Sequence, residues 1–329
     1  MTTYKEIFGK YVKNYSSDPT ADAEGQVWYN STSGTFKSQV SIGGTWAAGG
    51  NLTTARSDLG GAGTQTAALA FGGQTPPDSA ATEEYDGSTW SPGGNMGTAR
   101  YVPAGFGTQT AAVAAGGSPY PGTTAVEEYN GSTWSPATAL PGARQNAASF
   151  GTESDGGIAG GNSGSTKLNT TLEYNGSSWT SGGNLGTARY QFTGCGIAQT
   201  AALAFGGSTA PGPAGDTGAT EEYDGSSWTS GGTMNTARRR LGGSGIQTSA
   251  LAFGGNTIPV GVRSSVELYN GTSWTTTSSL ATARTGIGPA RFTSSNASGL
   301  AFGGATPSLS SATEQFTDPT LAVQTITTS

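Results

Sequence analysis

Six arginines stand at a fixed distance from six tryptophans, and their charge and spacing suggest one shared role. Each arginine follows a Trp by ten residues. The six are Arg56, Arg100, Arg144, Arg189, Arg238 and Arg284. Guanidinium groups bind anions or pair with carboxylates, and one or two glutamates follow each arginine within its repeat. We predict a structural ring of ion pairs within or between repeats, with an anion site at a channel mouth as the alternative.

The remaining reactive side chains argue against catalysis. The chain has no histidine and one cysteine, Cys195. This composition excludes Ser-His-Asp hydrolysis and His-ligated zinc. Neighbouring carboxylates such as Glu83 and Glu84 point to opposite faces of a strand, so they are poor acid–base partners. The candidate groups also recur in every repeat, whereas an active site breaks symmetry. We therefore predict a protein that is not an enzyme and has no metal site and no cofactor.

The elements that carry these residues repeat with a period of 44 to 49 residues. After each arginine come an Ala-rich run, a Gly-Gly doublet, and an acidic residue with an aromatic one such as Glu83 and Tyr85. An Asp-Gly or Asn-Gly turn then leads to the next Trp, and these dipeptides supply the positive φ angles that a two-residue hairpin needs. Each repeat thus reads as four short antiparallel strands, here called A to D. Six such units predict an all-β, six-bladed β-propeller.

The pattern "Thr-Ala-Arg, Gly-Gly, Glu-x-Tyr-Asp-Gly, Trp" resembles the kelch repeat. The resemblance extends from Gly44 to Phe316. It implies a kelch-like propeller with four strands in each blade.

Closure of the ring is predicted from one tryptophan that precedes the first repeat and has no counterpart at the end of the last one. The sixth repeat contains Arg284, Glu314 and Phe316 but no following Trp, whereas Trp46 precedes the first arginine. We predict that the strand around Trp46 completes the sixth blade, which removes an exposed sheet edge. The propeller then spans residues 44–319, and residues 320–329 are a C-terminal tail.

The loops between strands B and C vary most in length, and variable loops often form the binding face. By strand alternation they share one face with the six arginines. The candidate ligand-binding residues on these loops are Pro76, Asp78, Tyr120, Lys167, Asp216 and Arg263. The expected ligand is a host-surface glycan or protein.

The N-terminal residues differ from the repeats. Residues 1–24 form an arm that is either a docking segment or disordered, and residues 25–43 read as a β-hairpin or linker. The segment EGQVWYNSTSGTFKSQV is similar to segments of marine tailed-phage tail-fibre and other virion proteins. The resemblance implies that the arm docks on other virion proteins through Tyr4, Phe8, Tyr11 and Val12.

These observations predict a phage virion structural protein, a tail fibre, appendage or decoration, whose propeller serves host attachment by binding a host surface or a protein. The alternatives are a decoration protein that binds only other virion proteins and a kelch adhesion or scaffold protein unrelated to phage. The N-terminus lacks an apolar signal core, so we expect the protein to be made in the host cytoplasm and to reside in the virion. The net charge of −6 argues against nucleic-acid binding, and the absence of long apolar runs argues against membrane insertion.

Overall fold

The computed structural model describes residues 12–18, 27–41, 44–293, 295–317 and 321–326. It divides the chain into two units. The smaller combines Met1–Thr45 with Asp318–Ser329, and the larger is Trp46–Thr317. Among the described residues the only helical element is the 3₁₀ turn η1, Pro213–Gly215. None of the described segments forms a helix long and apolar enough to span a membrane.

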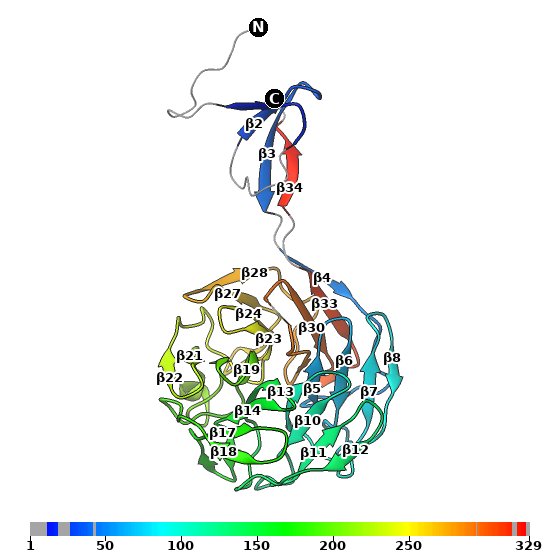
Figure 1. The fold of residues 1–329 in the computed structure, drawn as a ribbon, viewed down its shortest axis with the longest axis vertical. Coiled ribbons are helices and arrows are strands. Elements are labelled where there is room, and N and C mark those ends of the chain that lie inside the picture. Colours follow the sequence, from blue (N-terminus) through cyan, green and yellow to red (C-terminus); the bar gives the residue numbers. More distant parts are fainter. Residues whose placement is uncertain (1–11, 19–26, 42–43, 294, 318–320, 327–329) are drawn as a thin grey trace. The chain divides into compact units, whose positions relative to one another are not determined.

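The larger unit is a ring of four-stranded sheets around a common axis (Figure 1). Within the described residues there are six such sheets, which confirms the predicted all-β, six-bladed propeller. Blade one contains β5 (Gly60–Gly63), β6 (Ala68–Phe71), β7 (Thr82–Tyr85) and β8 (Trp90–Pro92). Blade two contains β9 (Ala104–Gly107), β10 (Ala112–Ala115), β11 (Val126–Tyr129) and β12 (Trp134–Pro136). Blade three contains β13 (Ala148–Thr152), β14 (Asp155–Ala159), β17 (Thr171–Tyr174) and β18 (Trp179–Ser181).

The other three blades follow the same order from the axis outward. Blade four contains β19 (Thr193–Ala198), β20 (Ala201–Phe205), β21 (Thr220–Tyr223) and β22 (Trp228–Ser230). Blade five contains β23 (Gly242–Ile246), β24 (Ser249–Phe253), β27 (Val266–Tyr269) and β28 (Trp274–Thr277). Blade six contains β29 (Gly288–Pro289), β30 (Ser298–Phe302), β33 (Thr313–Thr317) and β4 (Thr45–Ala48).

The sixth blade is closed by the N-terminal strand, as the sequence predicts. Strand β4 pairs with β33 at the outer edge of the sheet. Trp46 lies 5.2 Å from the ring of Phe316 and 5.4 Å from that of Phe253. Its indole N–H donates to the carbonyl of Ser278 in blade five at 3.1 Å. The strand therefore joins blade six to blade five as well as completing its own sheet.

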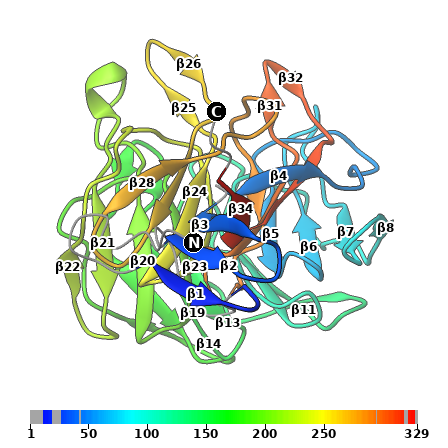
Figure 2. The same cartoon turned by 90° about the horizontal axis from the view of Figure 1, so that it is seen from above.

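Three small hairpins extend the loops between the second and third strands of a blade. They are β15 (Asn162–Ser163) with β16 (Thr166–Lys167), β25 (Asn256–Thr257) with β26 (Gly261–Val262), and β31 (Ala305–Thr306) with β32 (Ser308–Leu309). Figure 2 shows β25–β26 and β31–β32 projecting from the same side of the propeller.

The turns before the tryptophans differ from the expected two-residue hairpins. Tyr85 pairs with Trp90, so four residues connect the strands. Only the glycine, Gly87, has a positive φ, of 96°. The Asp86 carboxylate instead accepts the backbone N–H groups of Ser88 and Thr89 at 2.8 and 2.7 Å. These bonds hold the pKa of Asp86 well below its ordinary range. The prediction was wrong because the side chain, not the dipeptide alone, shapes the turn.

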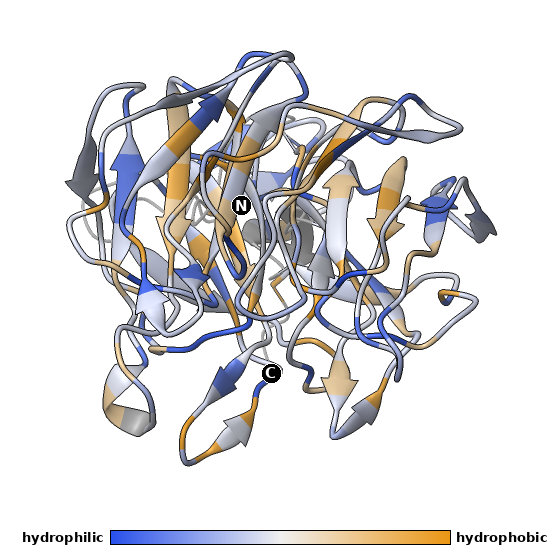
Figure 3. Cartoon of the chain, turned by 90° about the horizontal axis from the view of Figure 1, so that it is seen from below, coloured by the Kyte–Doolittle hydropathy of each residue, from blue (hydrophilic) through white to orange (hydrophobic). Residues whose placement is uncertain are grey.

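The core is divided among the interfaces between neighbouring blades. Six apolar clusters are found in the described residues, and each combines side chains of two consecutive blades. In one of them Phe71 of blade one lies 4.9 Å from Trp134 of blade two. Figure 3 shows the hydrophobic residues concentrated on the strands of the blades. Each blade is thus stabilised mainly by its two neighbours, and closure of the ring provides the last interface.

Tryptophan hydrogen bonds cross every one of these interfaces. The indole N–H of Trp134 donates to the hydroxyl of Thr82 in the preceding blade at 2.9 Å. Where the preceding blade has a valine in place of this threonine, the acceptor changes. Trp179 follows a blade with Val126 and donates to the carbonyl of Thr138 at 2.9 Å. The repeated Trp is therefore a structural residue that fastens each blade to the one before it.

Tyrosine and glutamate form a second link between blades. The Tyr129 hydroxyl donates to the carboxylate of Glu84 at 2.5 Å, and three further pairs repeat this contact. Blade six has Phe316 at the tyrosine position, and the preceding blade has Leu268 where blades one to four have glutamate. Donor and acceptor are thus lost together, which leaves no buried polar group without a partner.

Glutamine side chains in the turns between the first and second strands form a third link. Gln109 donates to the carbonyls of Ala68 and Tyr85 in the preceding blade at 3.0 and 2.7 Å. Blade three has Glu153 at this position, and a carboxylate cannot donate to carbonyls. Burial, followed by the nearby Glu128 carboxylate, raises the pKa of Glu153.

We expect the substitution Glu153→Gln to stabilise the protein at pH 7 by about 1–2 kcal/mol, because an amide restores two donors. The raised pKa means that the carboxyl costs stability once it ionises, so the gain appears as pH rises through the pKa of Glu153 and fades under acidic conditions. Urea unfolding at pH 7 and at pH 4 measures both effects. An equal gain at the two pH values would contradict the assignment.

The smaller unit is a four-stranded sheet with the order β1-β2-β3-β34. Its strands are β1 (Lys13–Tyr15), β2 (Val27–Asn30), β3 (Thr35–Ser41) and β34 (Leu321–Thr325). Strands β2 and β3 form an antiparallel hairpin, and β1 pairs with β2 in parallel. Strand β34, in the segment expected only as a tail, pairs with β3 from Lys37–Thr325 to Ser41–Leu321. The arm, the hairpin and the tail of the sequence analysis therefore contribute to one sheet.

Candidate binding face and axial pocket

The six arginines predicted as a structural ring are buried. Five of them pair with a glutamate of the next blade along the chain: Arg56–Glu83, Arg100–Glu127, Arg189–Glu221, Arg238–Glu267 and Arg284–Glu314. The nitrogen–oxygen distances range from 2.7 Å for Arg284 to 3.3 Å for Arg238. The side chains of these five arginines have no exposed surface. They fasten the connections between blades and cannot reach an anion in solvent.

Blade three replaces this ion pair with another arrangement. Leu172 stands where the other blades have glutamate, and Arg144 donates instead to the carbonyl and hydroxyl of Thr170 at 2.8 and 2.6 Å. In the other blades the glutamate also accepts a backbone N–H, as Glu127 does from Gly97 at 2.6 Å. Blade three has Pro141 at that position, which lacks an N–H. The three changes compensate one another. Burial without a nearby carboxylate lowers the pKa of Arg144 to about 10.

Three of the six predicted ligand-binding residues are engaged inside the loops. Asp78 accepts the hydroxyl of Ser118 from the neighbouring loop at 2.8 Å. Asp216 lies 3.3 Å from Arg239 and accepts the backbone N–H of Ile258 at 2.9 Å. Arg263 donates to Thr257 in its own hairpin at 2.9 Å. Asp78 and Asp216 therefore connect neighbouring loops, whereas Arg263 stabilises its own loop.

The other three are available at the surface. Pro76 is exposed and Lys167 is half-buried, whereas 71% of the Tyr120 surface is accessible. Val260 at the tip of the β25–β26 hairpin is 67% exposed and was not singled out from the sequence. Of the predicted docking residues, Tyr4, Phe8 and Tyr11 lie outside the described residues. Val12 is half-buried next to β1.

A second set of residues surrounds the propeller axis and was missed by the sequence analysis. The residue two positions after each arginine has a positive φ, between 50° and 63°. We call these six the axial ring: Asp58, Val102, Asn146, Gln191, Arg240 and Gly286. Each donates its backbone N–H to the carbonyl of the preceding member at 2.7 to 3.4 Å, which closes a circle of hydrogen bonds. A left-handed conformation costs non-glycine residues about 1–2 kcal/mol, so the circle is maintained against local strain.

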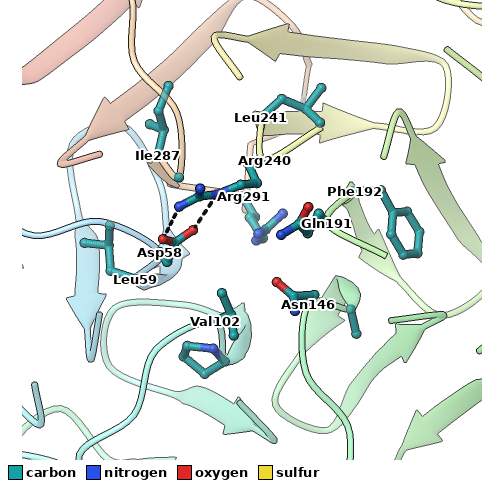
Figure 4. A pocket seen from close by; sticks show the side chains of 13 residues that line it. Asp58, Leu59, Val102, Asn146, Gln191, Phe192, Arg240, Leu241, Ile287 and Arg291 are labelled. Carbon is teal, nitrogen blue, oxygen red and sulfur yellow. Dashed lines mark hydrogen bonds and ion pairs between the residues drawn. The ribbon is translucent and has the colours of Figure 1, made fainter. Parts of the chain in front are cut away.

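The axial ring, the residue that follows each of its members, and Arg291 line a pocket of about 70 Å³. Figure 4 shows the polar side chains of Asp58, Arg240, Arg291 and Gln191 near the centre of the pocket, with apolar side chains such as Phe192 and Leu241 around them. Arg240 reaches Asp58 with two hydrogen bonds, one of 3.1 Å from Nε. Between them stands Gly286, where a Cβ would lie 2.7 Å from the Asp58 carboxylate. The glycine therefore leaves the space in which this ion pair forms.

Arg291 lies in the same pocket and enters from blade six (Figure 4). It replaces a glycine that the other five blades have at the corresponding position: Gly63, Gly107, Gly151, Gly196 and Gly245. Its Nη1 donates to the hydroxyl of Thr193 at 2.6 Å and to the carbonyl of Gly194 at 2.8 Å, both in blade four. Within the described ranges no carboxylate lies within ion-pairing distance of this guanidinium. Burial lowers the pKa of Arg291 to about 10.

The variable loops surround the mouth of this pocket. Isolated bridges join the loops to the segments that follow the arginines, as between Ser57 and Gln74 and between Arg239 and Asn256. The accessible loop residues Pro76, Tyr120, Lys167 and Val260, called the rim below, therefore lie on the same face as the axial ring. Among the part of the chain that the structure describes, no group of three His, Cys, Asp or Glu residues is arranged to hold a metal ion.

Comparison with known proteins supports the fold. No protein-family model matches the sequence, and no curated protein matches it. The chain is similar to the solved structure titled "Structure of YjhT", a kelch-like β-propeller, with a TM-score of 0.68 and 14% identity. The match covers 84% of this chain and 99% of that one. The larger unit is thus a kelch-like β-propeller, closed by its N-terminal strand.

Proposed function

We propose that the chain is a non-enzymatic virion protein of a phage, a tail fibre or appendage whose propeller attaches to a host-surface glycan or protein. Its small sheet docks on other virion proteins, and the mature protein resides in the virion. The proposal joins the tail-fibre resemblance of the N-terminal segment to the division of the chain into two units.

The topology is the observation that carries the proposal. The propeller is inserted between β3 and β34, which are neighbours in the small sheet. Both ends of the chain therefore belong to one unit, and a closed ring forms the other. Such a division suits a protein that is held at one unit and binds with the other.

The side chains of the propeller support a binding role over a catalytic one. The repeated glutamates accept from buried arginines or from tyrosines of the next blade. In the axial pocket the one lining carboxylate, Asp58, is held by Arg240. Neither set provides a free acid–base pair.

The test measures binding of the fluorescently labelled full-length protein to candidate host cells. We expect saturable binding, because exposed aromatic and aliphatic side chains on a rim are typical anchors. The double substitution Tyr120→Ser and Val260→Ser should weaken binding at least tenfold. Ile197→Ser is the matched control, since Ile197 is 41% exposed at the turn between the first two strands of blade four, on the opposite face.

Antibodies raised against the propeller provide the second measurement. They should label intact particles in electron micrographs, and they should block the binding of particles to cells. Labelling without any cell binding would favour the alternative, a decoration protein that binds only other virion proteins. Cell binding without labelled particles would instead indicate an adhesion protein unrelated to phage.

A further inference from the structure

We propose that the axial pocket binds the carboxylate group of an acidic ligand through Arg291, with Gln191 of the axial ring beside it. The proposal concerns the propeller alone and does not depend on its place in a virion.

The charge of the pocket points to an anion. Three of its lining residues are charged: Asp58, Arg240 and Arg291. Asp58 and Arg240 neutralise each other, which leaves the charge of Arg291 uncompensated. A half-buried cation without a carboxylate partner is unfavourable, and five of the six arginines of the structural ring are paired with glutamate. An incoming anion removes that cost.

The free hydrogen-bonding groups suit a planar oxyanion. Arg291 uses only Nη1 for its bonds to blade four, and its Nη2 and Nε donate to no described residue. The side-chain amide of Gln191 makes no hydrogen bond to the described residues, and Gln191 lines the same pocket, as Figure 4 shows. Nη2 of Arg291 and the side-chain amide of Gln191 can each donate to one of the two oxygens of a carboxylate.

The size of the pocket limits what it can hold. About 70 Å³ accommodates a carboxylate group with a water molecule, because one water requires about 10–15 Å³ by the same measure. The remainder of a larger acid must extend through the axial ring toward the rim loops. The ligand is therefore a free organic acid or a sugar acid that presents its carboxylate along the axis.

Departures from the repeat give independent support. The axial ring has six different residues at equivalent positions, whereas the buried arginines are identical in all six repeats. All six adopt a conformation that favours glycine although five are other residues, and one of these five is the β-branched Val102 with φ 50°. Arg291 likewise replaces a repeated glycine. Strain and asymmetry concentrated at one pocket are typical of a functional site.

The test measures the thermal unfolding midpoint of the full-length protein in sodium acetate and in sodium chloride at equal ionic strength and pH 7. A ligand that binds only the folded state raises the midpoint, so we expect a higher value in acetate. Sodium glucuronate, compared with glucose in sodium chloride, tests whether the carboxylate is accepted on a sugar. Isothermal titration with the same two acids provides the affinities.

Three variants make the result specific. Arg291→Gln should abolish the acetate response. Because Arg291 also contacts blade four, the isosteric Gln191→Glu provides a second probe: it places a carboxylate beside Arg291, and should raise the midpoint in chloride and remove the response to acetate. Lys13→Gln removes a positive charge outside the propeller and should respond as the wild type does.

The proposal is overturned if acetate and chloride give the same midpoint and titration detects no binding of either acid. It is also overturned if Gln191→Glu retains the full acetate response. A response to glucuronate but not to acetate would retain the site and assign it to sugar acids, whereas the reverse would assign it to small free acids.

Discussion

We expect deletion of residues 1–49 to lower the unfolding midpoint of the propeller by roughly 15 °C or more. The deletion removes β4, and with it the outer strand of blade six and the contacts of Trp46 with Phe253 and Phe316. Loss of a packed tryptophan alone costs about 3–5 kcal/mol, and each kcal/mol corresponds to roughly 2–4 °C in a domain of this size. The edge of β33 is also left unpaired. Circular dichroism during heating measures the change.

The matched control is deletion of residues 1–44, which removes β1 to β3 but retains β4. Its unfolding midpoint should stay within a few degrees of that of the full-length protein. Similar midpoints for the two truncated proteins would show that β4 does not close the ring. Comparing Trp46→Ala with Trp179→Ala distinguishes an effect on ring closure from an effect on local packing. Both indoles donate to a backbone carbonyl of the preceding blade, but only Trp46 lies in the closing strand β4.

The substitution Glu127→Leu should cost about 3–5 kcal/mol, because it leaves the fully buried Arg100 without its carboxylate. It also removes the acceptor of the Gly97 N–H, and an unsatisfied buried donor adds to the cost. The expected fall in the unfolding midpoint is roughly 10 °C. Thermal and urea unfolding of the full-length protein measure it.

Blade three provides the control for this substitution. It already has Leu172 at the glutamate position, together with Thr170 and Pro141. Adding Ala125→Thr and Gly97→Pro to Glu127→Leu transfers this arrangement to blade two. The triple variant should recover about half of the lost stability, since the hydroxyl accepts from the guanidinium and the unpaired N–H is gone. A triple variant no more stable than the single one would mean that blade three tolerates Leu172 for another reason.

The sequence predicts the ring because the residues that fasten neighbouring blades are the same in each repeat. The ten-residue spacing of Trp and Arg reflects two buried contacts, the indole bond to the preceding blade and the ion pair with glutamate. The sixth repeat lacks a Trp, and Trp46 precedes the first arginine. The position of Trp46 therefore identifies the strand that closes the ring. The exceptions also follow the pattern, as Phe316 and Leu268 show.

The axial pocket could not be found in the same way, because its residues share a position and a backbone conformation but no side-chain type. The sequence does contain a signal: Arg291 follows Arg284 by seven residues, and in the other five repeats the residue seven positions after the arginine is glycine. Asp78 and Asp216 were assigned to the binding surface because they lie on variable loops. Their partners, Ser118 and Arg239, come from neighbouring loops that the sequence does not place beside them. Strand β34 pairs with a strand 280 residues away and belongs to no repeat.

The insertion of the propeller between β3 and β34 has a mechanical consequence. Ser41 and Leu321 are paired residues of one sheet, so the two points at which the chain leaves that sheet for the propeller are tied together by hydrogen bonds. The strands that receive the chain, β4 and β33, are themselves neighbours in blade six. A pull on the small sheet is therefore shared by both ends of the ring and does not draw them apart. Under tension, the hydrogen bonds between β3 and β34 must break before a force on the N-terminal side can separate β4 from β33.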